Sequence, residues 1–481
     1  GTSTAHSDTG FMLYTKFISA ASFAALFFSA FCHAAETSYP LQDTPLSGGA
    51  GSVDQHDQNA YSLPQGNLPM TRRLDFSVGN SFFRNPWVVA PSSTDARDGL
   101  GPLFNTNSCQ GCHLKDGRGH APASIDAPSV SLFLRLSIPA DPERDAVFLR
   151  EHGVVPDPVY GGQLQTAAIP GMKPEADLIV EWEAVTQTLG DGTEVVMRKP
   201  IYRIENPNYG EMSEDLLTSP RVAPPMIGLG LLQAIPEDVL LAAADPEDEN
   251  GDGISGRANQ VWDRVAEKTV LGRFGWKAGQ PNVMQQSMDA FAGDMGLTSS
   301  VALSTDCTPQ QQCERFPNGG VPEVSDKVAG FIEFYSMSLA VPTRRDMDDP
   351  EVQRGAELFN QIGCAACHTP SYTTGQHERA DLSEQVIWPY TDLLLHDMGP
   401  GLADGRGEFL ADGNEWRTPP LWGLGLTKTV NPLAGFLHDG RAETVEHAIL
   451  WHDGEARAAA DEYRLLPANE REALLRFLNS L

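Results

Sequence analysis

Two short motifs each place a pair of cysteines beside a histidine. They read Cys-Gln-Gly-Cys-His at 109–113 and Cys-Ala-Ala-Cys-His at 364–368. This spacing lets one helical turn present both thiols on one face, where each can add to a vinyl group of a c-type haem as a thioether. The histidine then binds the iron from the proximal side. The sequence therefore predicts two covalent haems, haem one on Cys109, Cys112 and His113, and haem two on Cys364, Cys367 and His368.

Zinc sites and redox dithiols also use Cys-x-x-Cys pairs, and four cysteines together could close a zinc site. Neither alternative accounts for a histidine directly after each pair. The sequence before the motifs also repeats. Leu103-Phe104-Asn105 precedes Cys109 and Leu358-Phe359-Asn360 precedes Cys364, with three residues in between in each case. We therefore expect a phenylalanine-bearing helix before each motif.

Length and composition place the chain among ordinary globular proteins. It has 481 residues, 41% of them hydrophobic and 20% charged, which is enough for two or three domains. The formal net charge is -30, so nucleic acid is not an expected partner. A basic protein or a cation fits this charge, and so does a simple gain in solubility for an exported protein.

The N-terminal region resembles a secretory signal peptide, which we assign to residues 12–35. Lys16 precedes an apolar run at 17–31, and small residues follow at Ala34 and Ala35. The run is short for a membrane span, so we expect a periplasmic protein without stable membrane insertion after cleavage. An uncleaved anchor is the alternative.

Export also bears on the cysteines outside the two motifs. Of the seven cysteines, Cys32 leaves with the signal peptide and four belong to the motifs. The remaining two, Cys307 and Cys313, are expected to form a disulfide in an oxidising compartment, with two free thiols as the alternative.

The rest of the chain divides into a lead-in and two haem domains. Residues 36–69 lack apolar periodicity and are expected to form an extended lead-in or a poorly ordered arm. An N-terminal cytochrome c-like domain follows at 70–340. Its β insertion is predicted as a hairpin, with strands at 178–183 and 194–198 on either side of Gly-Asp-Gly.

The C-terminal cytochrome c-like domain is assigned to residues 350–481, after a boundary near 340–349. A capped amphipathic helix begins near Asn469 and is expected to pack against the helix before Cys364. A further repeat, Pro-Pro-x-x-Gly-Leu-Gly-Leu, follows each motif, at 224–231 and 419–426. The predicted fold is mainly α, with the two cytochrome c-like domains in tandem.

These residues together resemble the di-haem oxidoreductase family, whose members are described as peroxidases or thiol oxidoreductases. More distantly, the C-terminal half resembles bacterial di-haem cytochrome c peroxidases and MauG enzymes. The resemblance implies an electron-transfer haem and a reactive haem, the reactive one in the N-terminal half. It is carried by both haem motifs and by Val78–Phe83, Gly272–Lys277, Leu393–Gly399, Phe436–Arg441 and Ile449–His452.

The sixth ligand of haem two is assigned to His452, because it follows a helical stretch at the position where the peroxidase relatives carry their distal ligand. Spacing alone leaves other candidates open, namely His396, Met398, His438 and His447. A methionine ligand is common in cytochromes c.

Haem one is expected to have an open iron position, because residues 232–244, which follow the Pro-Pro repeat of the first half, contain no histidine. A ligand from afar is the alternative, with Met284, Met288 and Met295 as candidates. For catalysis we assign His113, Gln163 and Gln233, and Gln165 and Glu181 are further candidates for distal hydrogen bonding.

Asp248-Glu249-Asn250-Gly251-Asp252-Gly253-Ile254 spaces oxygen ligands as calcium loops do, with glycine at the sixth position. Position 12 is Asn259, not glutamate, so an acidic turn is the alternative. The predicted calcium ligands are Asp248, Asn250, Asp252, Ile254 and Asn259.

Two function classes follow from these features. As an enzyme, the protein would reduce hydrogen peroxide or another small oxidant at haem one. Electrons would arrive through haem two from a small periplasmic cytochrome c or cupredoxin. As a carrier, it would relay electrons between partners, or act in metal or thiol redox chemistry.

Overall fold

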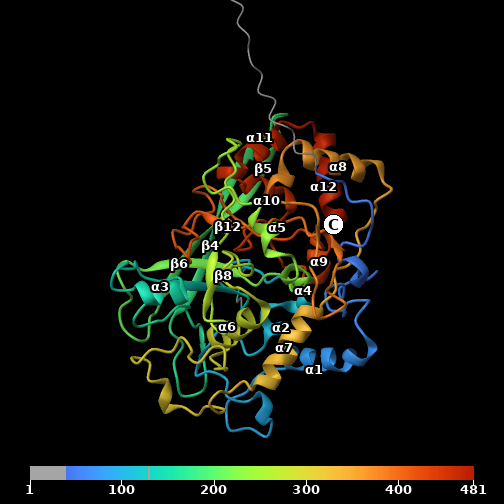
Figure 1. The fold of residues 1–481 in the computed structure, drawn as a ribbon. Coiled ribbons are helices and arrows are strands. Elements are labelled where there is room, and N and C mark those ends of the chain that lie inside the picture. The colour runs from blue at the N-terminus through green and yellow to red at the C-terminus, as the bar shows by residue number, and fades with distance from the viewer. Residues whose placement is uncertain (1–38, 128–129) are drawn as a thin grey trace, which may run out of the picture. The chain divides into compact units, whose positions relative to one another are not determined.

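A computed structural model describes residues 39–127 and 130–481, shown in Figure 1. The signal peptide predicted for residues 12–35 lies outside them. The structure is 29% helical and 18% strand, so the fold is mixed rather than mainly α. Within these residues, no helix combines the length and the apolar character that a membrane span requires.

Most of the helices are short. The α-helices are α1 (Arg73–Arg84), α2 (Cys109–Cys112), α3 (Ala146–His152), α4 (Leu229–Gln233), α5 (Glu237–Leu241), α6 (Val283–Met295), α7 (Asp326–Ser338), α8 (Pro350–Gln361), α9 (Thr427–Val430), α10 (Val445–Trp451), α11 (Arg457–Leu465) and α12 (Ala468–Ser480).

The strands pair as two-stranded antiparallel sheets. These are β1 (Leu103–Phe104) with β3 (Ala167–Ala168), β2 (Leu132–Ser137) with β6 (Leu217–Val222), β4 (Asp177–Thr188) with β5 (Glu194–Glu205), β7 (Gln260–Asp263) with β8 (Lys268–Leu271), β9 (Tyr372–Thr373) with β10 (Val386–Ile387), and β11 (Leu395–Asp397) with β12 (Glu415–Arg417).

Helices α8 and α12 pack together, as the sequence predicts (Figure 1). Asp349 caps α8 by accepting a hydrogen bond from Glu351 N over 2.8 Å. A Cβ at Gly355 would lie 2.1 Å from Ala473 O, so only glycine permits this close approach. The rings of Phe359 and Phe477 fill the crossing, with centroids 5.3 Å apart.

The same arrangement occurs in the first half, where α1 packs against α7. A Cβ at Gly79 would lie 2.3 Å from Phe331 O. The rings of Phe83 and Tyr335 lie 5.2 Å apart at this crossing. The helix before the second motif thus has its counterpart in α1.

The helix expected directly before the first motif does not form. Leu103 and Phe104 instead make strand β1, paired with Ala168 and Ala167 of β3. The preceding Gly101 has a φ of +81°, which a right-handed helix does not allow, and Pro102 lacks an N–H group. The short resemblance to 358–360 is therefore one of sequence, not of structure.

The predicted hairpin is confirmed and is longer than expected. β4 and β5 pair over twelve residues each, from Asp177 opposite Glu205 to Thr188 opposite Glu194. Its turn reaches the C-terminal half, where Asp191 pairs with Arg471 at 2.8 Å. The insertion therefore packs against elements of both halves.

The two Pro-Pro repeats adopt similar turns and contact each other. Gly228 and Gly423 have φ values of +71° and +73°. A Cβ at Gly228 would lie 2.1 Å from Trp422 Cζ2, so the copies meet closely. Residues 39–481 form one compact unit, and the boundary expected at 340–349 falls between α7 and α8. Tandem cytochrome c-like domains stay a prediction.

The segment expected as a lead-in contributes to the core. Within 39–69 the chain makes one 3-10 turn at Gly49–Gly51 before the turn that opens α1. Ala60 and Tyr61 are buried in the cluster that also holds Trp422. This part of the lead-in is packed, not a loose arm.

The disulfide between Cys307 and Cys313 is confirmed, with Cα atoms 6.4 Å apart. It closes a small loop between α6 and α7.

Candidate haem sites

A cavity of about 1130 Å³ lies against the first motif. Cys109, Cys112 and His113 form part of its wall, with Thr106 beside them. Ser108 caps the short helix α2 by accepting a hydrogen bond from Gly111 N over 3.1 Å. This cap fixes the turn that presents both thiols, which are free of disulfides.

His113 is oriented by the first Pro-Pro repeat. Its Nδ1 lies 2.7 Å from Pro224 O. Because a carbonyl only accepts, Nδ1 carries the proton and Nε2 keeps its lone pair. Burial lowers the pKa of His113 to about 4, so the imidazole is neutral and suited to an iron ligand.

The second motif is arranged in the same way, with a second histidine close by. His368 Nδ1 donates to Tyr390 O over 2.9 Å, and His452 Nδ1 donates to Ala448 O over 2.6 Å. Burial and, to a smaller extent, the neighbouring His452 lower the pKa of His368 to about 4. The structure therefore brings together two neutral imidazoles whose Nε2 atoms are free of these bonds.

His396 is engaged by carboxylates at both ring nitrogens. Nε2 lies 2.6 Å from Asp392 and Nδ1 lies 2.6 Å from Glu455. Burial opposes the charge, but Asp392 and Cys367 outweigh it and raise the pKa of His396 well above its usual value. A doubly protonated imidazole has no lone pair for iron, so this candidate for the sixth ligand is excluded in this arrangement.

The other candidates have different surroundings. His438 stacks on Trp416, with ring centroids 3.7 Å apart. Met398 packs in the hydrophobic cluster around Trp276 and Trp416. His447 lies in the first turn of α10, where burial lowers its pKa. None of these contacts joins a candidate to His368, so His452 stays the assignment.

A four-cysteine zinc site is not formed. Among the residues that the structure describes, the metal-sized group of His, Cys and carboxylate side chains is Cys367, Asp392 and His396. It holds one thiol, and its histidine is protonated as above. The two cysteine pairs therefore serve separate sites.

Two buried arginines indicate that the cavity suits a haem with its anionic propionates. Arg417 and Arg118 line it, and burial lowers the pKa of each to about 10. Arg417 donates to Arg273 O over 2.8 Å, and its Nε atom has no partner. Among residues 39–127 and 130–481, neither forms an ion pair with a carboxylate. A buried guanidinium without an anion is costly, so propionates would complete this wall.

Replacing Arg417 with glutamine is expected to lower the reduction potential of haem one and leave that of haem two unchanged. A nearby cation stabilises the reduced state, and its loss favours the oxidised state. A redox titration that follows the two haems separately measures this. Arg203→Gln, at an exposed ion pair with Glu181, is the control. Equal potentials in Arg417→Gln and wild type would contradict the assignment.

Neither glutamine assigned to catalysis lines the cavity. Gln163 donates to Asn105 Oδ1 and Asp294 Oδ1 over 2.8 and 2.7 Å, which ties down the end of α6. Gln233 accepts a hydrogen bond from Val283 N over 2.8 Å. Their catalytic role stays a prediction without a contact to support it.

The other candidates for distal contacts are also placed by the structure. Gln165 donates to Gly293 O over 2.6 Å outside the cavity wall, and Glu181 forms an exposed ion pair on the hairpin. Met284 and Met288 pack in the core around α6, whereas Met295 lines the cavity.

Two cavity residues were missed by sequence reasoning. Gln286 of α6 lines the cavity, and its buried Oε1 atom has no partner. His152, the last residue of α3, also lines it and stacks on Phe148 at 4.2 Å. Neither stands near a cysteine motif or in a repeat, so no local signal marked them.

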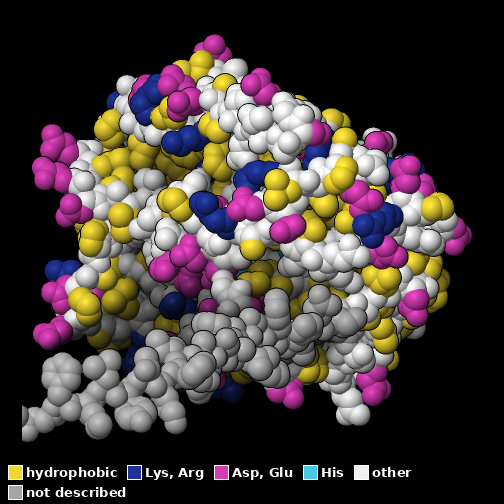
Figure 2. All heavy atoms as spheres, turned by 90° about the horizontal axis from the view of Figure 1, so that it is seen from above, with side chains coloured by type: hydrophobic (Ala, Val, Ile, Leu, Met, Phe, Trp, Pro, Cys, Tyr) yellow, Lys and Arg dark blue, Asp and Glu magenta, His cyan; other side chains and the backbone are white. Residues whose placement is uncertain are grey.

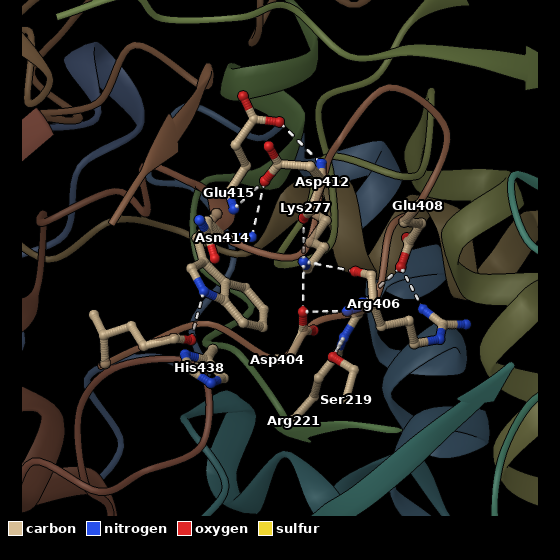
Figure 3. A network of polar contacts seen from close by, with 12 residues as sticks. Ser219, Arg221, Lys277, Asp404, Arg406, Glu408, Asp412, Asn414, Glu415 and His438 are labelled. Atoms are coloured by element: carbon tan, nitrogen blue, oxygen red, sulfur yellow. Dashed lines mark hydrogen bonds and ion pairs between the residues drawn. The ribbon is translucent and has the colours of Figure 1, made fainter. Parts of the chain in front are cut away.

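A loop of the C-terminal half brings charge into the wall of the same cavity. Glu408 accepts hydrogen bonds from Arg221 over 2.6 Å and from Arg406 over 3.2 Å (Figure 3). Burial disfavours its charge, but the two guanidinium groups bring the pKa of Glu408 down to about 2. The cavity at the first motif therefore has a wall built from both halves.

The predicted calcium loop does not gather its five ligands. Asn250 Oδ1 accepts from Asp252 N, and Asp252 Oδ1 accepts from Ile254 N, both over 2.8 Å. Asn259 is buried, and its amide donates to Lys277 O over 2.8 Å. The first positions are thus bonded within their own turn, and calcium binding stays a prediction.

The acidic balance of the chain is visible on the surface. On the face shown in Figure 2, acidic side chains are spread among basic and apolar ones instead of gathering in one patch. On this face, the distribution of charge does not indicate a docking site for a partner.

Comparison with known proteins gives a family. Residues 42–481 match the family described as "Di-haem oxidoreductase, putative peroxidase". None of the curated proteins matches the chain significantly in sequence. Among solved structures, a chain of hydrazine synthase from Kuenenia stuttgartiensis, pressurised with 20 bar xenon, is similar at 13% identity and a TM-score of 0.31. The match covers 87% of this chain and 95% of that one. A similarity of this size supports no argument about function.

Proposed function

Because this chain belongs to the di-haem oxidoreductase family, we propose that it reduces hydrogen peroxide at haem one with electrons received through haem two. The difference between the two histidine sites carries this proposal. The buried His452 lies near His368 and contributes to the lowering of its pKa, whereas the pKa of His113 is lowered by burial with no histidine among the causes. His113 instead borders the large cavity. An open site suits binding of a small oxidant, and a site closed by two imidazoles suits electron transfer.

The chain's own residues have definite tasks in this proposal. Cys109 and Cys112 would hold haem one covalently, and Pro224 O keeps the proton on His113 Nδ1. Haem supplies the redox chemistry when bound. The Gln286 amide could hydrogen-bond an oxidant in the cavity, because its Oε1 atom has no other partner. The donor would be a small cytochrome c or cupredoxin in the periplasm.

The proposal is tested with carbon monoxide on the reduced protein and cyanide on the oxidised protein, followed by peroxide turnover with a reduced donor. We expect one haem to bind these ligands and peroxide loss to depend on the donor. His377→Ala, on a loop away from the cavity wall, is the control variant. If neither haem binds a ligand in any redox state while both cycle reversibly, the protein is an electron carrier.

Replacing His452 with alanine is expected to convert haem two from low spin to high spin. Loss of the sixth ligand leaves the iron five-coordinate or bound to water. Electron paramagnetic resonance of the oxidised protein measures the spin states of both haems. His447→Ala, in helix α10 just before His452, is the matched control and should keep both spectra. If haem two stays low spin in His452→Ala, the sixth ligand is Met398 or another residue.

A further inference from the structure

A buried phenol and a carboxylate form a hydrogen-bonded pair beside the first motif. Tyr335 of α7 is fully buried, and its hydroxyl donates to Asp116 Oδ1 over 2.7 Å. The other carboxylate oxygen accepts from Ser62 Oγ, also over 2.7 Å. Asp116 follows the proximal His113 by three residues, and Tyr335 contacts Phe83 of the cavity wall, so the pair lies behind the wall of the haem-one cavity.

An aromatic path joins this phenol to the proximal ligand. The ring of Phe83 lies 5.2 Å from that of Tyr335 and 6.1 Å from that of His113. The hydroxyl group is therefore connected to haem one through packed side chains and through the Asp116 turn.

The second half provides an internal comparison. There Phe477 occupies the corresponding place, with its ring 5.3 Å from Phe359, which lies 6.3 Å from His368. The helix crossing thus needs an aromatic ring but no hydroxyl. A buried phenol, Tyr390, also lies 5.8 Å from Phe359, but it donates to Gln42 and not to a carboxylate. The pair of phenol and carboxylate occurs at haem one, where the proposed reaction takes place.

We propose that Tyr335 is a redox-active residue that gives one electron to the reaction at haem one while its proton passes to Asp116. This inference rests on the proposed function. Reduction of peroxide to water takes two electrons and two protons. When haem two is already oxidised, Tyr335 would supply one electron and become a neutral radical, and haem one, when bound, would supply the other. The phenolic proton passes to Asp116 Oδ1 along a hydrogen bond whose oxygen atoms are 2.7 Å apart, and the protons for water come from solvent.

The surroundings favour transfer of the proton together with the electron. Burial raises the pKa of Tyr335 far above its usual value, and the Asp116 carboxylate adds to this. Phenolate therefore does not form beforehand, and a cationic phenol radical in a buried site would be costly. A carboxylate already hydrogen-bonded to the hydroxyl accepts the proton without any rearrangement.

The test is electron paramagnetic resonance of the oxidised holoprotein, frozen soon after addition of peroxide without donor. We expect a tyrosyl radical in wild type, its loss in Tyr335→Phe and a lower yield in Asp116→Asn. Tyr335→Phe introduces the ring that the second half already carries at this crossing, so we expect it to fold. Tyr463→Phe is the matched control, because Tyr463 is equally buried and donates to the Glu446 carboxylate over 2.7 Å.

The outcomes separate this inference from the proposed function. A radical that persists in Tyr335→Phe, or is lost in Tyr463→Phe instead, overturns the role of Tyr335. Peroxide consumption at haem one without any radical also overturns it and leaves the proposed function standing. If peroxide is not consumed and no radical forms, both fail.

Discussion

A variant in which Cys109 and Cys112 are both serine is expected to carry one covalent haem and to lose donor-dependent peroxide turnover. Serine cannot form the thioether bonds, so haem one is no longer attached. The loss should be complete, because the proposed route ends at this haem. Haem two should remain, since Cys364 and Cys367 belong to a separate site. The intact mass of acid-extracted chains gives the number of covalent haems, and turnover is measured on the same preparation.

The matched control replaces two cysteines that do not belong to a motif. A variant with serine at both Cys307 and Cys313 loses the disulfide but should keep two covalent haems. Two covalent haems in the variant that lacks Cys109 and Cys112 would contradict attachment of haem one to these cysteines. A single covalent haem in wild type would contradict it as well. One haem with full peroxide turnover would keep the attachment and move the reaction to haem two.

Local patterns in the sequence were sufficient for the features that depend on neighbouring residues. The cysteine motifs, the hairpin around residue 190 and the disulfide all involve short separations. The α8 and α12 contact was also predictable, because both helices are amphipathic and the second motif defines their common site. The helix predicted before the first motif was wrong, because Leu103-Phe104-Asn105 resembles 358–360 in sequence but follows Gly101-Pro102, whose backbone does not allow a helix.

What the sequence did not reveal are contacts between distant segments. Tyr335 and Asp116 are 219 positions apart, and Lys277 and Asp404 are 127 apart. None of these four residues lies in a sequence pattern that predicts its partner. Arg417 stands in strand β12, far from the first motif, yet it lines the cavity there. Such residues are found from burial and unmet hydrogen bonds, which exist only once the chain is folded.

Replacing Lys277 with methionine is expected to destabilise the protein by about 3–5 kcal/mol, the usual cost of leaving a buried charge without its partner. The side chains of Lys277 and Asp404 are 0% and 1% exposed, with Nζ and Oδ1 2.9 Å apart. Nζ also donates to Arg406 O over 2.9 Å and to Asp412 O over 2.7 Å (Figure 3). One ammonium group thus holds the loop that carries Arg406 and Glu408 to the cavity. Denaturant unfolding of the holoprotein measures the loss.

The expected loss of stability comes from the burial of the Lys277 charge and not from the ion pair as such. A second, exposed ion pair provides the comparison. Arg203 and Glu181 form an ion pair at 2.6 Å, but both side chains are 41% exposed. Arg203→Met is therefore expected to cost less than about 1 kcal/mol. Adding Asp404→Leu to Lys277→Met should recover part of the loss, because it removes the unpaired carboxylate. Equal losses in Lys277→Met and Arg203→Met would mean that the buried ammonium does not anchor the cavity loop.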